Sequence, residues 1–291
     1  MPTDHIHLWR SFLFVYIFSR LSNMIVYVIL FVIVCLLLGY TKRKKFEKYD
    51  FKCFLLAMKN EPSRSEKFIR SIDKKIPLEI IYGKDTRTPK LAEKYREHVD
   101  PDYFEKAVEM YNDPDVKRPD ITYFNLGAIG CFMGHMKFYE KCINQGLKYA
   151  VIFEDNVVID SNKVYDEIQS VINEKGDDFD MCFFHCLSRL PDKMEGTLEK
   201  VKWISSTKCY LINVNNMAWY KRFFFPMDNH VDMKHEDLIS RGARVYYKDL
   251  SKFMHVDRTH KSTIGHSEHG RPLFFSRVFP DATPDDLKPG Y

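Results

Sequence analysis

The chain has 291 residues, of which 45% are hydrophobic and 29% are charged, and its formal net charge is +4 at pH 7. This length is enough for one sizeable α/β domain and a short additional segment. Acidic and basic residues are mixed along the chain, whereas a dedicated nucleic-acid binder gathers basic residues on one face, so we expect no nucleic-acid partner.

The first fifty residues predict a membrane anchor. Residues 24–40 form an uncharged run of 17 residues, close to the shortest length with which a helix crosses a bilayer. Residues 1–23 precede it as a tail with a second apolar stretch, and residues 41–50 follow it as a basic linker. A cleaved signal peptide fits poorly, because no small-residue cleavage site follows the run. A buried core helix is the alternative, which the uniformly apolar character of the run disfavours.

The charges near the anchor bear on its direction. Four consecutive basic residues at 42–45 outweigh Arg10 and Arg20, and the positive-inside rule would then leave the large domain in the cytosol. The sequence contains no Asn-x-Ser/Thr acceptor, so it gives no support for a glycosylated luminal protein. We expect a single-pass protein of an endoplasmic reticulum or Golgi-type membrane, or of a viral or host membrane, with the side of the domain left open.

The first elements after the anchor are predicted to be a strand, a helix and a strand, at residues 51–58, 63–73 and 78–82. The helix start rests on a capping box formed by Ser63 and Glu66. Residues 86–120 are charged and contain four prolines, so we expect a surface insertion with a helix that begins at Pro101.

The stretch from residue 126 to residue 160 is the most informative part of the sequence. Apolar residues spaced by three and four predict a helix that stops at Gly146, a residue type that readily takes the left-handed conformation of helix ends. The apolar run at 149–153 then predicts a buried strand.

An acidic cluster, Glu154-Asp155-Asn156, directly follows this strand. In open α/β sheets, ligands bind beyond the carboxyl ends of the strands. Oxygen donors at such a position suit Mg²⁺ or Mn²⁺, and the cation would in turn hold phosphate oxygens. A trio of this kind is also common in loops and helix caps, so it is weak support by itself.

The rest of the chain alternates helices and strands. Helices are predicted at 163–175, 215–225 and 231–241, strands at 180–185, 205–212 and 244–247, and an edge hairpin within 188–204. This alternation predicts a single α/β domain over residues 51–291, with a mostly parallel central sheet flanked by helices. Seven cysteines occur without a CxxC pair, which argues against a zinc ribbon or a thioredoxin-type motif.

The central stretch resembles the core signature of glycosyltransferase family 25. The matching positions are Gly127, Ile129, Gly130, Cys131, His135, Glu154 and Asp155. The sequence departs from the family pattern at Ala128, Gly134 and Asn156, where the family has Glu, Ser and Asp. Weaker matches extend over residues 51–266, among them Arg64, a Val-Asp pair at Asp232, and Ser262.

The resemblance implies a GT-A-like domain and a hexosyltransferase. Such an enzyme would transfer a hexose from a nucleotide sugar, with UDP as the expected carrier, to a hydroxyl of a glycan or protein acceptor, assisted by Mn²⁺ or Mg²⁺. The resemblance also implies a luminal domain, in conflict with the charge rule above. Two alternatives stay open: a family member that has lost catalysis and serves as a binding or scaffold protein, and a metal-dependent hydrolase.

The resemblance assigns candidate roles to individual residues. Catalysis is assigned to Asp232 and Glu154, with Asp232 as a metal ligand or as the base that accepts the acceptor proton. Contacts with the nucleotide sugar are assigned to Arg64, Gly130, Asp155 and Ser262. The metal ligands are expected among Asp155, Asn156, Asp232 and His255.

Each of these residues also has a plainer interpretation. Arg64 would then be a solvated residue at a helix start, and Asp232 and Glu236 would be surface charges on a helix. His135 is expected to be packed and hydrogen-bonded rather than a ligand. The histidines near the C-terminus match no common zinc spacing, and His255 alone is kept as a candidate ligand because it follows a strand-like run.

Overall fold

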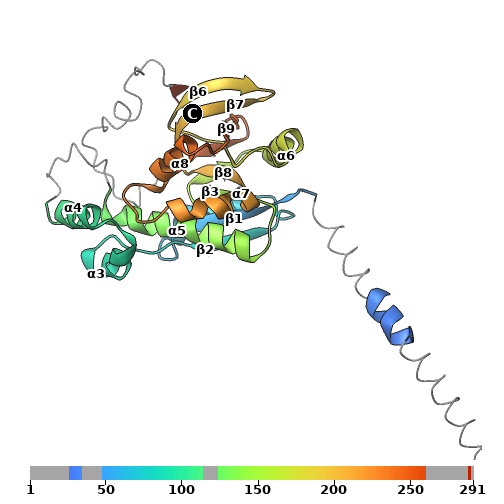
Figure 1. The fold of residues 1–291 in the computed structure, drawn as a ribbon, viewed down its shortest axis with the longest axis horizontal. Helices are drawn as coiled ribbons and strands as arrows, with labels where there is room; N and C mark the ends of the chain where they lie inside the picture. The colour runs from blue at the N-terminus through green and yellow to red at the C-terminus, as the bar shows by residue number, and fades with distance from the viewer. Residues whose placement is uncertain (1–25, 35–47, 114–123, 260–287, 290–291) are drawn as a thin grey trace, which may run out of the picture. The chain divides into compact units, whose positions relative to one another are not determined.

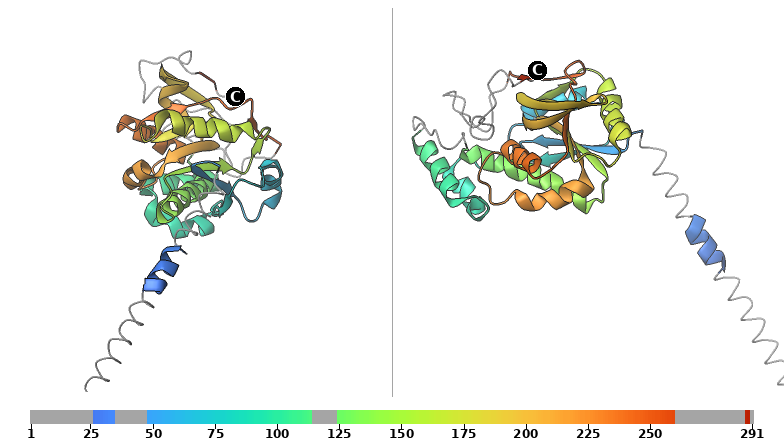
Figure 2. Two further views of the ribbon diagram at one scale, coloured as in Figure 1. Left: turned by 90° about the vertical axis from the view of Figure 1, so that its right-hand side faces the viewer. Right: turned by 45° about the horizontal axis from the view of Figure 1, so that its top comes forward.

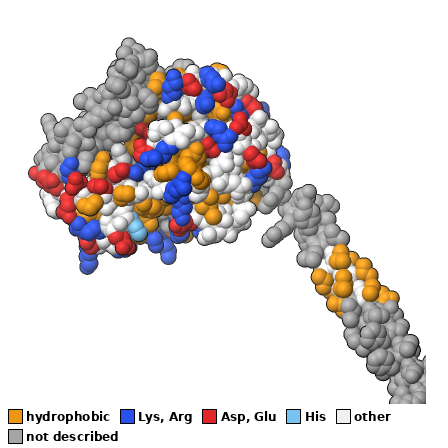
Figure 3. Space-filling model, in the orientation of Figure 1, with side chains coloured by type: hydrophobic (Ala, Val, Ile, Leu, Met, Phe, Trp, Pro, Cys, Tyr) orange, Lys and Arg blue, Asp and Glu red, His pale blue; other side chains and the backbone are white. Residues whose placement is uncertain are grey.

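The computed structural model describes residues 26–34, 48–113, 124–259 and 288–289. The chain divides into two units, Met1–Lys48 and Tyr49–Tyr291. In the first unit, residues 26–34 are helical and their apolar side chains are exposed, as the orange atoms of this segment show in Figure 3. No helix in the described part of the chain has both the length and the apolar character needed to cross a membrane. The rest of the predicted anchor and Ser262 lie outside the described residues.

The second unit is built around one large sheet (Figure 1). Its strand order is β11-β6-β7-β9-β5-β8-β3-β1-β2. The bounds are β1 Phe51–Ala57, β2 Leu78–Tyr82, β3 Tyr149–Glu154, β5 Met181–Phe183, β6 Ser188–Glu195, β7 Leu198–Ser205, β8 Cys209–Asn213, β9 Val245–Tyr247 and β11 Lys288–Pro289. A separate two-stranded ribbon pairs β4 (Val157–Ile159) with β10 (Met254–Val256).

The sheet is mixed, so the prediction of a mostly parallel sheet is wrong. Strand β1 is parallel to β2 and β3, and β5 is parallel to β9, but β8 is antiparallel to both of its neighbours, β3 and β5. The β6–β7 hairpin, which turns at Gly196 with a φ of 68°, adds further antiparallel pairs. The alternation of helices and strands predicts most strands of the large sheet, but it predicts neither the β4–β10 ribbon nor that β8 runs between two strands of the opposite direction.

Helices cover both faces of the sheet (Figure 2). On one face lie α3 (Pro89–Ala92), α4 (Pro101–Asn112), α5 (Leu126–Asn144), α7 (Val214–Tyr220) and α8 (Val231–Ser240); on the other lie α2 (Pro62–Ser71) and α6 (Lys163–Lys175). Successive side chains of a strand point to opposite faces. Ile152 of β3 therefore joins the core under α5, and Phe153 joins the core under α2 and α6.

Some local predictions hold and others do not. Helix α5 ends before Gly146, which has a φ of 61° as the helix-end argument requires. Helix α2 begins at Pro62, one residue before the predicted capping box, and the side chain of its N-cap residue, Glu61, does not cap the helix. The predicted surface insertion contributes to the core, because Phe104 and Ala107 of α4 are fully buried.

Helix α5 lies unusually close to the loop that follows β2. The backbone N–H of Gly130 donates to Thr86 Oγ1 at 2.8 Å, and Thr86 in turn donates to the carbonyl of Leu126 at 2.6 Å. A Cβ atom at Gly130 would lie 2.1 Å from the carbonyl oxygen of Lys84. This close approach explains why glycine occupies the position.

Substituting Gly130 by alanine is expected to destabilise the protein. Alanine favours a helix over glycine by about 1 kcal/mol, but the clash with backbone atoms should outweigh that gain and lower the free energy of unfolding by about 2 kcal/mol. Gly134→Ala is the matched control, because its Cβ would meet the flexible end of Leu56 at 2.7 Å rather than backbone. Urea denaturation should show a clear loss for Gly130→Ala only; equal stability of the two variants would contradict the packing argument.

Candidate functional site

One edge of the sheet gathers most of the candidate residues. Strands β1, β2, β3, β5 and β9 run in the same direction, so their carboxyl ends share an edge, and the antiparallel β8 begins there. Arg64 follows β1, the acidic cluster ends β3, and Thr207 and Lys208 precede β8. Residues separated by more than one hundred positions in sequence are thereby brought to one place.

Glu154 is the most tightly held carboxylate of this edge. It is 9% exposed, accepts hydrogen bonds from Thr207 Oγ1 and Lys208 Nζ, and its Oε1 lies 3.7 Å from His135 Nε2. Burial alone would raise the pKa of Glu154, but the charge of Lys208 and the contact with His135 outweigh burial and hold the pKa well below its usual range. Glu154 is therefore ionised at neutral pH.

Asp155 is held from the other face by Arg64. Arg64 Nε donates to Asp155 Oδ2 at 3.2 Å and Nη2 donates to Oδ1 at 2.9 Å, and both residues are less than 10% exposed. The interpretation of Arg64 as a solvated helix-start residue is therefore wrong. Two parallel bonds of this kind fix the carboxylate in position and orientation.

The alternation of strand side chains explains why the two neighbouring carboxylates have different partners. Glu154 continues the series of Ile152 and lies under α5, whereas Asp155 lies on the side of α2. The structure thus does not gather the trio into one carboxylate cluster. It places one carboxylate on each face of the sheet.

Asn156 lies in the turn between β3 and β4. Its backbone carbonyl accepts a hydrogen bond from the N–H of Asp257 at 2.7 Å. Its side-chain Oδ1 is buried and has no hydrogen-bond partner among the described residues. A buried acceptor without a partner is uncommon and marks a position where a ligand or cation could be bound.

Asp232 lies in the first turn of α8, on the same side of the sheet as Glu154. It is partly exposed, and its Oδ1 accepts a hydrogen bond from the N–H of Met233 at 3.1 Å. Burial raises the pKa of the Cys131 thiol on α5 well above its usual value; the charges of Glu154, Asp232 and Asp155 raise this pKa further, and the charge of Lys208 lowers it.

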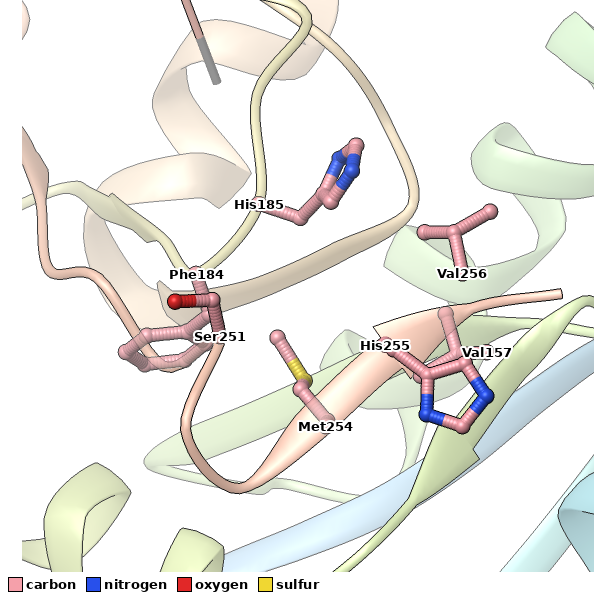
Figure 4. A pocket seen from close by; sticks show the side chains of 7 residues that line it. All are labelled: Val157, Phe184, His185, Ser251, Met254, His255 and Val256. Carbon is pink, nitrogen blue, oxygen red and sulfur yellow. The ribbon is translucent and has the colours of Figure 1, made fainter. Parts of the chain in front are cut away.

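His255 lies on β10, which pairs with β4 directly after Asn156. Its Nδ1 contacts Asp160 Oδ2 at 2.7 Å, and its side chain is 55% exposed. It contributes to the wall of a small pocket together with His185 (Figure 4), and burial followed by the charge of Lys208 lowers the pKa of His185 to about 4. Asp155 and Asn156 are adjacent in the turn after β3, Asp232 lies in the first turn of α8, and the side chain of His255 pairs with Asp160.

Behind Glu154, a chain of buried hydrogen bonds connects two histidines. His135 Nδ1 lies 2.7 Å from the hydroxyl of Tyr210, this hydroxyl lies 3.0 Å from that of Tyr139, and Tyr139 lies 2.6 Å from His235 Nε2. The expectation that His135 is packed and hydrogen-bonded agrees with these contacts.

Glu236 is a further residue that the sequence did not single out for a role. It lies one turn after Asp232 on α8 and is 6% exposed, so the interpretation as a surface charge is wrong for Glu236. Burial raises the pKa of Glu236 well above its usual value, and the charge of Asp232 raises it further. A hydrogen bond with Trp203 lowers this pKa, but by less. Lys208 was missed as well, because its position beside Glu154 depends on tertiary structure.

Stability should depend on pH through Glu236. Its pKa is higher in the folded than in the unfolded protein, where it is near 4.5, so the folded state loses stability as the pH rises above this value. A Glu236→Gln variant should therefore gain stability over the wild type between pH 5 and pH 8, by at most about 1.4 kcal/mol per pH unit. Denaturation curves at several pH values test this. Glu97→Gln, which changes an 81% exposed side chain, is the control. If stability depends on pH in Glu236→Gln as steeply as in the wild type, the argument is disproved.

Comparisons with known proteins place these residues in a family context. The model of glycosyltransferase family 25 (LPS biosynthesis protein) matches residues 50–230. Two curated relatives are named "Probable inactive glycosyltransferase 25 family member 3" (Rattus norvegicus) and "Inactive glycosyltransferase 25 family member 3" (Mus musculus). They are 27% and 25% identical over 121 residues, which is 41% of this chain. The chain spans only 19% of the length of these relatives.

The solved structures that resemble this chain have low TM-scores. A UDP-glucose pyrophosphorylase complexed with UDP-glucose has a TM-score of 0.35 and 11% identity, over 68% of this chain and 90% of that one. A UTP-bound UGPase from Acinetobacter baumannii has a TM-score of 0.36 and 9% identity, over 69% and 86%.

Proposed function

Since the chain belongs to glycosyltransferase family 25, we propose that it binds a nucleotide sugar, with UDP as the carrier, at the carboxyl edge of its sheet, and that it transfers the hexose to a hydroxyl of a glycan or protein. The observation that carries the proposal is the group of charged residues at this edge: Lys208 is bound by Glu154 and Arg64 is bound by Asp155, and Asp232 lies on the same side of the sheet as Glu154.

The donor diphosphate is anionic and needs a positive partner. The side chain of Lys208 is 26% exposed, and its ammonium group is oriented by Glu154. An ammonium group held in this way can contact a phosphate while Glu154 keeps it in place. Arg64 is committed to Asp155, so we assign it the positioning of that carboxylate rather than direct contact with the donor. A GT-A-like arrangement of the domain is part of the same proposal.

A divalent cation, Mn²⁺ or Mg²⁺, belongs to this proposal as well. The residues that fit it are Asn156, whose buried Oδ1 accepts no hydrogen bond within the described ranges, and Asp232, which has no cationic partner there. Asp155 would support the cation from its ion pair with Arg64. When bound, such an ion supplies positive charge to the departing diphosphate.

The transfer itself exchanges one bond for another. The bond between the sugar carbon and the phosphate oxygen breaks, a bond to the acceptor oxygen forms, and the acceptor proton must be taken up. Asp232 is the carboxylate that suits this task, because it is partly exposed at the edge and carries no ion pair in the described part of the chain. Glu154 contributes by holding Lys208 in place.

The N-terminal segment would tether the domain to a membrane. Residues 24–40 are uncharged, and the described part of this segment, residues 26–34, is helical with exposed apolar side chains. Exposed apolar helices of this composition are stable in a bilayer rather than in water.

A second function is favoured by specific observations. Asn156 replaces the acidic residue of the family pattern, Asp155 is neutralised by Arg64, and the relatives above are named inactive. A protein with these features could bind a nucleotide sugar without transferring it. Release of UDP from UDP-galactose and UDP-glucose, measured with and without Mn²⁺, separates the two functions: turnover supports the transferase, and binding without turnover supports the binding protein.

An Asn156→Asp variant is expected to bind Mn²⁺ at least about tenfold more tightly than the wild type, because a carboxylate adds one unit of negative charge to the ligand set. Titration calorimetry with Mn²⁺ measures the change. Asn162→Asp, a substitution of the same kind at the start of α6, should leave the affinity unchanged. An unchanged affinity in Asn156→Asp would remove Asn156 from the proposed ligands.

A further inference from the structure

Three side chains of metal-binding type meet between α5 and the end of β3. Cys131 Sγ, a ring nitrogen of His135 and a carboxylate oxygen of Glu154 lie within 4.8 Å of one another. No ion pair or transfer step described above uses Cys131, and no other such group occurs in the described portion of the chain. We propose that Cys131, His135 and Glu154 form a binding site for a divalent zinc ion, distinct from the site of the hard cation.

The helix presents the first two ligands on one side. Cys131 and His135 are four residues apart on α5, and side chains at this spacing lie one above the other. Gly134 of α5 packs on Leu56 of β1, which is the registered neighbour of Glu154 in β3. Glu154, the third ligand, therefore lies opposite the part of α5 that carries Cys131 and His135.

The imidazole is oriented as a metal ligand requires. His135 is fully buried, and its Nε2 has no hydrogen-bond partner within the described ranges, while it lies 3.7 Å from Glu154 Oε1. This separation is close to that of two ligands that each lie about 2.0–2.1 Å from one zinc ion. His135 Nδ1 contacts the hydroxyl of Tyr210, so this nitrogen can carry the proton and leave Nε2 free for the metal.

The carboxylate has the outer partners that ligating carboxylates usually have. Glu154 Oε1 accepts a hydrogen bond from the hydroxyl of Thr207, and Oε2 accepts one from the ammonium group of Lys208. One oxygen thus retains a lone pair for the metal while Lys208 stays bound to the other. A thiolate and a carboxylate together balance the charge of the divalent ion.

The ligand types decide which metal is favoured. A thiolate combined with an imidazole suits zinc, whereas Mg²⁺ and Mn²⁺ prefer oxygen donors. Three protein ligands leave a fourth coordination position open, as in zinc sites that bind water or a substrate oxygen. Cys131 is partly exposed, so this position is near the surface of the edge where the donor is proposed to bind.

The zinc content of the purified full-length chain tests the proposal. We expect about one zinc ion per chain by elemental analysis, and its loss in Cys131→Ala and in His135→Gln. Cys142→Ala is the matched control, because Cys142 is a buried cysteine of the same helix outside the cluster, and it should keep the metal. Tyr210→Phe should weaken zinc binding by about 10- to 100-fold.

Cobalt provides a second measurement that does not depend on the metal retained in purification. Co²⁺ added to the chelator-treated protein should give a thiolate-to-cobalt absorption band that Cys131→Ala abolishes. The proposal is overturned if the wild type neither retains zinc nor shows this band, or if Cys131→Ala retains both. If His135→Gln does not fold, Cys131→Ala alone tests the proposal. Cys131 is partly exposed, so its replacement by alanine should not prevent folding. Donor binding without zinc would overturn this inference alone, and zinc without donor binding would overturn only the proposed function.

Discussion

Replacing Arg64 by methionine is expected to lower the free energy of unfolding by about 3–5 kcal/mol, because the substitution leaves the buried carboxylate of Asp155 without its positive partner. Both side chains of this pair are 8% exposed, so water cannot replace the lost bonds. Urea denaturation at pH 7 measures the effect.

Two controls belong to this prediction. Arg70→Met removes a 79% exposed arginine that pairs with Glu66 on the same helix, and it should change stability by about 0.5 kcal/mol or less. The double variant Arg64→Met/Asp155→Leu should recover a large part of the loss, since it leaves no unpaired charge. A loss in Arg64→Met no larger than that in Arg70→Met would show that the pair is not buried as described.

An Asp232→Asn variant is expected to lower the rate of donor turnover by about 10²- to 10⁴-fold, the usual contribution of a general base. The amide keeps the shape of the side chain and its hydrogen bond with Met233 but cannot accept the acceptor proton. The rate of UDP release in the presence of an acceptor measures the change.

The measurement also separates the two roles proposed for Asp232. A loss of turnover with unchanged Mn²⁺ affinity identifies the base, and a loss of both identifies a metal ligand. Asp237→Asn, on the same helix with a 52% exposed side chain, is the control and should keep the wild-type rate. Wild-type turnover in Asp232→Asn would exclude both roles.

The local structure of the central stretch could be predicted from sequence, because its determinants are local. The periodicity of α5, the glycine after its end and the apolar run of β3 act within a few residues of one another. The direction of β8 could not be predicted in this way. Its position between β3 and β5 depends on which strands pair across the sheet.

The candidate site was predictable only in part, for the same reason. The sequence identified the acidic residues after β3, yet their partners lie 91 positions away at Arg64 and 54 positions away at Lys208. No pattern in the sequence reports such pairs. A spacing that does carry information is the four-residue separation of Cys131 and His135 on a helix, which is a ligand spacing that a search for CxxC pairs does not detect.

Calorimetric titration of the purified chain with UDP-galactose and UDP-glucose in the presence of Mn²⁺ tests the central claim most directly. We predict saturable binding of at least one of these donors to the wild type, and an affinity at least about tenfold lower in a folded Lys208→Met variant, which lacks the ammonium group proposed to contact the diphosphate. Absence of binding for both donors, or equal affinity in the wild type and Lys208→Met, would contradict the proposed donor site.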